Sequence, residues 1–353
     1  MIKYFTFRMK DSLKLIILLS VIALISSYAY SFDGYIRYYF SYNTEIPLPQ
    51  NTPIDCMLVI AMGLSFIVPI FEFKYRMRKI TVDQLYSFPI KREKLFLTNL
   101  LVGYLEIMIP VTVSFLFFVI DMGIEPDVFD NKYIVPFYFT TFITVFICYS
   151  FVTFCFMRGN TVIDGFINII FGFFFFVCLF VMIEQIHYSS YTHHTNYDSF
   201  IVPSYSYSFI PAGIFGDYFT DQMIWKAYND AGSNFRIVNP EIDTKEWIFI
   251  IFNFIVSIIA FVLSIVLVKK EKSEDSMQIS NSWFSYKVMI PFYVFFISFM
   301  TGYTNTSIIV YLFILLGGYI LYVIYRRTMK IKWYDYCILV SVVLVASLIG
   351  AAI

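Results

Sequence analysis

The chain has 353 residues, of which 59 % are hydrophobic and only 14 % are charged. Soluble domains contain about 45–50 % apolar and about 25 % charged residues, so a soluble core cannot hide this much apolar surface. The 25 basic and 25 acidic residues cancel, and the net charge gives no reason to expect a nucleic-acid partner. The composition predicts an all-α polytopic membrane protein.

Apolar blocks long enough to cross about 30 Å of hydrocarbon at 1.5 Å per residue recur along the chain. The first block follows basic residues, as in a signal peptide, but no convincing cleavage site follows and we expect it to be retained. Gly103 and Pro110 interrupt the third block, which membrane helices tolerate. Nine spans are predicted, near residues 13–32, 55–72, 95–120, 133–156, 163–186, 247–268, 288–304, 307–325 and 333–353.

The distribution of Lys and Arg predicts an orientation, because basic residues are retained on the cytoplasmic side of short loops. Twenty of the 25 basic residues fall in the amino-terminal segment and in loops of the same parity, and five fall in the alternate loops. We therefore expect a multi-pass protein of the plasma membrane with a cytoplasmic amino terminus. Nine spans place the carboxyl terminus outside, and it moves inside if one late block does not cross.

Residues 1–12 precede the first span and have their own pattern. Ile2, Phe5, Met9 and Leu13 recur at intervals of three and four, with basic and polar residues between them. This spacing predicts an amphipathic helix that lies in the membrane interface. The alternative is a basic terminus without regular structure.

The 73–94 loop is the most informative segment on the predicted cytoplasmic side. Thr81 is followed three residues later by Gln84, a capping-box pattern that predicts a short helix starting at Thr81. Phe88 and Pro89 end this helix, because proline disfavours helical geometry in the residue before it. Its shared apolar face consists of Val82, Leu85 and Tyr86. A loop whose charges only enforce topology is the alternative, and contact with anionic lipid also fits.

A long segment, residues 184–246, lies on the predicted outer side. Within it, residues 204–219 are apolar but too short to cross, and the Pro211–Gly213 stretch would break a helix. We expect a re-entrant pair of short helices packed against the other spans, because irregular backbone at that depth must be covered by protein.

The same outer segment holds all three histidines, and their imidazoles could bind zinc with Glu184 or Asp198. The histidines are His187, His193 and His194. Their spacing lacks the HExxH pattern that places two ligands on one helix face. A solvated polar loop is the favoured interpretation, and no metal site is predicted.

Two acidic residues in or beside spans are candidates for a role. Glu106 is well inside the third span, where an ionisable group suggests either a functional role or a pairing with a polar neighbour. Asp164 lies near the cytoplasmic interface, and its expected partner is Arg158. The chain has no GxxxxGK[ST] motif and therefore no P-loop.

The order of segments resembles the membrane subunits of type-2 ABC exporters, the ABC-2 permease family. Residues 1–268 reproduce an amino-terminal amphipathic helix, six spans, a coupling helix between the second and third span, and a re-entrant excursion between the fifth and sixth. The closest local likeness is RKITVDQLYSFPIKREKLFLTNLLVGYL, residues 78–105. Residues 269–287 form a cytoplasmic linker, and residues 288–353 append about three spans that the family's six-span core lacks.

The resemblance implies that residues 81–90 contact a separately encoded ATPase and that the 157–162 turn supplies a smaller contact. It also implies a homo- or heterodimer of permeases, and it implies that ATP and Mg²⁺ bind the partner rather than this chain, which would then be no enzyme. The expected coupling residues are Thr81, Val82, Asp83, Gln84, Leu85, Tyr86, Pro89 and Arg158.

Two functions are carried forward from the sequence. The first is the permease of an ABC exporter, with a peptide, antibiotic such as an antimicrobial peptide, or other amphipathic compound as cargo. The second is a membrane-embedded enzyme that works at the outer face through the histidine loop. A sensor or assembly protein without transport is a third alternative.

Overall fold

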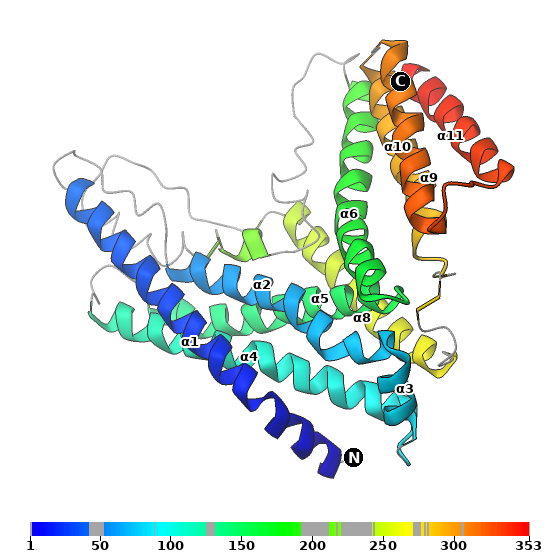
Figure 1. Cartoon of the computed structure of the whole chain (residues 1–353). Helices are drawn as coiled ribbons and strands as arrows, with labels where there is room; N and C mark the ends of the chain where they lie inside the picture. Colours follow the sequence, from blue (N-terminus) through cyan, green and yellow to red (C-terminus); the bar gives the residue numbers. More distant parts are fainter. Residues whose placement is uncertain are drawn as a thin grey trace. The chain divides into compact units, whose positions relative to one another are not determined.

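The computed structural model of the chain is mostly helical in the part that it describes (Figure 1). It describes residues 2–41, 53–87, 89–124, 131–191, 212–216, 218–219, 242, 244–270, 277–278, 280, 282–304 and 307–352. No strand occurs among these residues. The chain is an all-α polytopic membrane protein, as its composition predicted.

Each of the nine apolar blocks forms a long helix, and short helices lie between the second and third blocks and between the third and fourth. The long helices are α1 (Ile2–Ser41), α2 (Pro53–Phe73), α4 (Arg92–Ile124), α5 (Ile134–Met157), α6 (Val162–Tyr191), α8 (Thr244–Lys270), α9 (Tyr286–Tyr303), α10 (Ile308–Arg326) and α11 (Trp333–Ala352). The short ones are the 3₁₀ turns η1 (Lys74–Met77) and η2 (Asn131–Tyr133) and the helix α3 (Lys79–Tyr86).

Eight helices in the described residues are long and apolar enough to cross a membrane. The seventh block, α9, is 18 residues long and is not among the eight. Its ends carry polar side chains, with Tyr286 and Lys287 at the start and Thr301 and Tyr303 at the end. The prediction of nine spans is therefore supported for eight.

Helix α1 differs from the sequence prediction at its start. Residues 2–12 do not form a separate helix, because α1 runs without a break from Ile2 to Ser41. The candidate span within it covers Ile2–Ala29. The turn or proline that would separate an interfacial helix from the span is missing from the sequence between them, so the first turns continue directly into the apolar block.

The chain folds into two compact units that do not follow the predicted division at residue 268. Unit 1 comprises residues 1–74, 85–154 and 210–270, and unit 2 comprises residues 75–84, 155–209 and 271–353. The border passes within helix α3 and within the last turn of α5. Helix α6 thus belongs with α9, α10 and α11 rather than with the four spans that precede it.

In unit 1, helix α4 packs against α1, α2 and α8. Aromatic rings fill its interior, for example Phe73 of α2 against Phe96 of α4 with ring centroids 5.2 Å apart. The hydroxyl groups of Ser27 and Ser114 hydrogen-bond across α1 and α4 at 2.6 Å. Small polar residues of this kind suit helix contacts in a membrane, where apolar side chains gain little by leaving lipid.

The later part of the outer segment, including residues 212–216 and 218–219, belongs to unit 1, whereas residues 184–191 are the end of α6 in unit 2. Residues 212–216, which include Gly213, are helical, and Phe219 packs on Phe137 of α5 with ring centroids 5.6 Å apart. Pro211 lies outside the described residues. The expected packing of this segment on a span is thus observed at Phe219, whereas its depth in the membrane stays a prediction.

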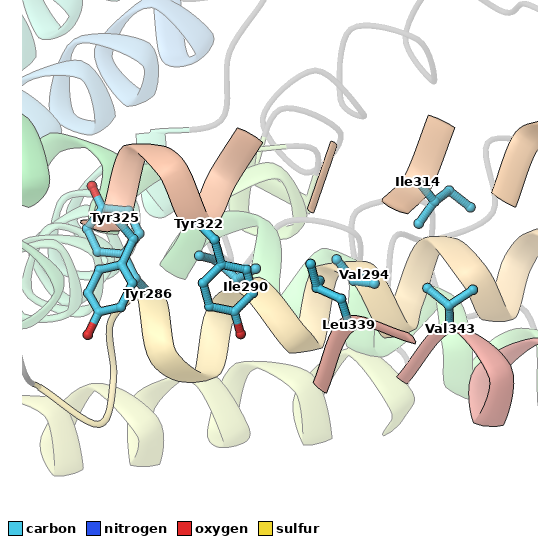
Figure 2. Close-up of a cluster of buried hydrophobic side chains, with 8 residues drawn as sticks. All are labelled: Tyr286, Ile290, Val294, Ile314, Tyr322, Tyr325, Leu339 and Val343. Atoms are coloured by element: carbon cyan, nitrogen blue, oxygen red, sulfur yellow. The ribbon is translucent and has the colours of Figure 1, made fainter. Parts of the chain in front are cut away.

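In unit 2, helices α9, α10 and α11 surround one buried cluster, and α6 packs on α9. Figure 2 shows the cluster along α9, with the Tyr286 and Tyr325 rings beside each other at one end and Ile314 and Val343 at the other. The two tyrosine ring centroids are 5.2 Å apart. The buried cluster consists of Tyr286, Ile290, Val294, Ile314, Tyr322, Tyr325, Leu339 and Val343.

Helices α9 and α11 approach closely because glycines face the partner helix at their contact. A methyl group at Gly302 would lie 2.6 Å from the backbone oxygen of Ser347, and one at Gly350 would overlap the backbone oxygen of Phe299. Backbone atoms cannot rotate away as a side chain can. Only glycine fits at these two positions without separating the helices.

We expect Gly350→Ala to lower the free energy of unfolding by about 1–3 kcal/mol, because the new methyl group overpacks the α9–α11 contact. Gly317→Ala is the matched control, since a methyl group at Gly317 has nothing within 4 Å. The control should be neutral or slightly stabilising. Thermal unfolding in lipid nanodiscs measures both, and equal midpoints for the two variants would contradict the close approach.

Candidate functional site

A short helix is present where the sequence predicted one, but it starts earlier than the sequence suggested. Helix α3 begins at Lys79, directly after the 3₁₀ turn η1, so Thr81 is not its cap. The Thr81 hydroxyl instead donates to the backbone oxygens of Tyr75 at 2.5 Å and Arg78 at 2.8 Å. A threonine hydroxyl inside a helix can bond back to the preceding turn, and here this bond joins η1 to α3.

The two sides of α3 differ in exposure. Val82 is buried with 1 % of its surface exposed, whereas Ile80 is 75 % exposed and Asp83 and Gln84 are also exposed. Leu85 and Tyr86 are half-buried. The predicted face that centres on Val82 is therefore confirmed, and an isoleucine lies on the opposite, open side.

After Tyr86 the chain turns and enters α4. Pro89 is exposed in this turn, and the guanidinium of Arg92 lies 4.5 Å from the centre of the Tyr86 ring. A cation over an aromatic ring is worth about 0.5–1 kcal/mol at an exposed site. This contact holds the last residue of α3 against the first turn of α4.

The start of this segment docks on the turn between α5 and α6, within unit 2. Arg76 donates from Nη1 to the backbone oxygen of Met157 at 2.5 Å, and the same nitrogen lies 3.2 Å from the sulfur of Met157. A methyl group at Gly165 would lie 2.9 Å from Met77 Cε. The 157–162 turn therefore supports the segment that leads into α3.

Arg158 is buried, with 7 % of its surface exposed, and so it is not an open contact surface in this structure. Its backbone oxygen accepts a hydrogen bond from Ser280 at 2.6 Å. The resemblance implied that Arg158 meets the partner ATPase. The structure instead places it behind the surface, where its backbone holds the segment that precedes α9.

Asp164 is the centre of a group of interactions between segments distant in sequence. Its backbone nitrogen donates to the Thr161 hydroxyl, which caps the start of α6. Its carboxylate accepts from Arg327 at 2.9 Å and from the Tyr286 hydroxyl at 3.0 Å. The sequence suggested Arg158 as the partner of Asp164. In the structure Arg327 is the partner, because the α10–α11 turn lies beside the start of α6.

Two backbone conformations support the same contacts. Among the described residues, the non-glycine residues with positive φ are Met277, at 68°, and Arg327, at 54°. Arg327 Nη1 donates to the backbone oxygen of Met277 at 3.3 Å, and Met277 donates to the backbone oxygen of Asn160 at 3.0 Å. A left-handed conformation costs of order 1 kcal/mol or more without glycine, so these contacts offset strain.

We call this set of contacts the polar junction; it consists of Asn160, Asp164, Ser280, Tyr286 and Arg327. It joins the 157–162 turn, the start of α6, the start of α9 and the end of α10. Asp164 lies in the first turn of α6, where the helix dipole also favours a negative charge. The polar junction can hold these four segments as one body.

The other candidates from the sequence lie elsewhere. Glu106 is fully buried in α4 of unit 1. His187 is in α6, and His193 and His194 lie outside the described residues. Within the part of the chain that the structure describes, no group of three or more His, Cys, Asp or Glu side chains could hold a metal ion.

Sequence reasoning did not find Ser280, Tyr286 or Arg327. One local signal was present, because Thr161 and Asp164 have the spacing of a cap followed by an acid in the first turn. The partners of Asp164 had no such signal, since Tyr286 and Arg327 lie more than a hundred residues away along the chain.

Comparison with protein-family models, with curated proteins and with solved structures finds no match to this chain. The function must therefore be inferred from the residues and their geometry.

We expect Arg327→Gln to lower the free energy of unfolding by about 1–3 kcal/mol, because it leaves the largely buried Asp164 carboxylate without its cation. Lys330→Gln, at an exposed position of the same turn, is the control. A double-mutant cycle with Asp164→Asn measures the coupling by thermal unfolding in nanodiscs. Strictly additive effects of the two changes would show that the pair contributes nothing.

Proposed function

We propose that this chain is the permease subunit of an ATP-driven ABC exporter, which forms part of a path across the plasma membrane and is driven by a separate ATPase. The observation that carries the proposal is α3. It is a short helix between two spans with one buried face, and its other face exposes Ile80 beside Asp83 and Gln84.

An exposed isoleucine between polar neighbours is typical of a small protein contact with an apolar centre and a polar rim. Basic residues surround α3 on both sides along the chain. They favour the cytoplasmic side, where an ATPase would be found. The amino terminus would then be cytoplasmic too, because α1 and α2 are two successive candidate spans before α3.

The packing of α3 gives the proposal a mechanism. Residues 75–84 belong to unit 2, and the rest of α3 belongs to unit 1. Force on the exposed side of α3 would act on the 157–162 turn through Arg76 and Met77, and from there on the polar junction. Closure of the ATPase on ATP would in this way move the α6 and α9–α11 helices of unit 2 together.

The proposal includes a second permease, identical or related, with the cargo path at the interface of the two. An amphipathic peptide or antibiotic is the proposed cargo, because the chain is 21 % aromatic. Aromatic residues are also ordinary lipid-facing and interfacial residues, so this part depends mainly on the resemblance to exporter permeases. No observation among the described residues supports the alternative, an enzyme that works through the histidine loop.

The test is co-purification with each P-loop ATPase encoded near the gene for this chain. We expect Ile80→Glu combined with Asp83→Arg to reduce the retained ATPase at least tenfold, because it places charge in the apolar centre and reverses a rim charge. Lys132→Glu, an exposed change in the turn η2 directly before α5, should leave retention unchanged. Wild-type protein that retains no ATPase, or retention unaffected by the double change, would refute the proposal.

Cysteine labelling tests the orientation separately. In a background without the five native cysteines, Asp83→Cys should react with a membrane-impermeant maleimide only after the cells are permeabilised. Lys132→Cys should react in intact cells, because the single span α4 separates the two positions. The reverse pattern would place α3 outside and exclude a cytoplasmic ATPase at this helix.

A further inference from the structure

Unit 1 contains three ionisable side chains, from three different helices, that lie close together. Arg8 comes from α1, Glu72 from α2 and Glu106 from α4. Glu72 is 4 % exposed and Glu106 is not exposed at all. Glu106 lies about 20 Å along the helix axis from Arg92, where α4 begins, and is thus deep in the span.

Glu72 is fully matched by Arg8. The Nη2 atom of Arg8 donates to both carboxylate oxygens of Glu72, at 2.8 Å and 2.9 Å. Arg8 also reaches Asp11 on its own helix at 3.1 Å. One guanidinium therefore binds one buried carboxylate and one exposed carboxylate.

Glu106 has no such match. Within the described residues, neither of its carboxyl oxygens has a partner at hydrogen-bond geometry, although the Ser12 hydroxyl of α1 and the Glu72 carboxyl lie close to it. The charged and titratable groups of the surrounding helices are Arg8 and Asp11 of α1, Glu72 of α2 and Tyr149 of α5. Two further groups are already engaged, since Tyr4 donates to Asn99 at 3.1 Å and Lys269 of α8 pairs with Glu93 at 3.2 Å. An ionised Glu106 would leave one buried negative charge in excess.

The site is shaped so that these groups can meet. A side chain at Gly103, one turn before Glu106, would overlap the Tyr149 hydroxyl oxygen and lie 3.1 Å from Glu72 Cγ. The Tyr149 hydroxyl donates away from the carboxylates, to the backbone oxygen of Leu100 at 3.2 Å. Gly103 thus lets Glu72 and Tyr149 approach α4. The Tyr149 hydroxyl does not donate to either carboxyl group, because its proton is used in the bond to Leu100.

We propose that Glu106 is an intramembrane proton-binding site that holds one exchangeable proton when unit 1 is assembled as described. With this proton the Arg8, Glu72 and Glu106 side chains are together neutral, and no unpaired charge is buried in the span. A proton is favoured over a metal ion, because the described residues offer no group of three or more acidic, His or Cys ligands. This inference does not depend on the proposed ATPase.

The proton controls how α1 is held against α2. When Glu106 loses it, a second carboxylate competes for the single guanidinium of Arg8. The Arg8–Glu72 pair then weakens, and the assembled form of unit 1 becomes less stable as the pH rises. Water solvates the ionised Glu106 carboxylate in the unfolded chain, whereas the buried site does not, so ionisation destabilises the assembled form relative to the unfolded chain.

Infrared difference spectroscopy of the purified full chain in nanodiscs tests the site directly. The wild type should show the carbonyl band of one protonated carboxylic acid at neutral pH, lost on titration to alkaline pH. Glu106→Gln should remove this band, and Glu106→Asp should shift it. Glu93→Gln is the control and should leave the band unchanged, because Glu93 is a half-exposed carboxylate that pairs with Lys269. A wild-type spectrum without the band, or a band that survives in Glu106→Gln, would overturn the proposal.

Thermal unfolding gives an independent readout in case a variant is poorly folded. The midpoint of Glu106→Gln should exceed that of the wild type at alkaline pH, and the difference should shrink as the pH falls. A Glu106→Gln variant that is less stable than the wild type, with a deficit that grows with pH, would mean that the ionised carboxylate is the stabilising form. That result would refute a bound proton.

Discussion

Hydrocarbon offers no hydrogen bonds and solvates no charge, and this constraint acts on the polar groups that lie within the spans. It explains why the described residues form helices, whose backbone groups are satisfied within each segment. It also explains why the buried ionic groups are joined in small sets. In unit 1 Arg8 serves Glu72, and in unit 2 Arg327 serves Asp164. Each pair connects segments far apart in sequence, and each therefore defines which helices belong together.

The polar junction shows how the carboxyl-terminal helices take part in the fold. Because Arg327 follows α10 and Tyr286 begins α9, the ion pair and hydrogen bond of Asp164 join both helices to the start of α6. The cluster around Tyr286, Tyr322 and Tyr325 continues this contact into the helices. The last third of the chain is consequently part of the unit that receives the start of α3, rather than an appendage to a six-span core.

The same constraint gives different results at Asp164 and Glu106. Asp164 lies at a helix start with a cation, a tyrosine hydroxyl and a favourable dipole, so its negative charge is accommodated. Glu106 lies deep in α4 beside a carboxylate that already holds the only arginine of the set. A carboxyl group in that position is accommodated most easily in its neutral form. The two acids thus have separate parts in the proposals, one in a structural junction and one at an exchangeable proton.

The sequence by itself determined the helical, membrane-spanning character and the approximate position of each long helix, because span length and apolar content are local properties. It also located a short helix near residues 81–90 with Val82 on its buried side. It misplaced the start of that helix, because the Thr81 hydroxyl bonds back to Tyr75 instead of capping. Only the tertiary structure decided that Asp164 meets Arg327, that Arg158 is buried and that α6 joins α9–α11. Those outcomes depend on which helices pack together, and no local spacing encodes a contact across 163 residues.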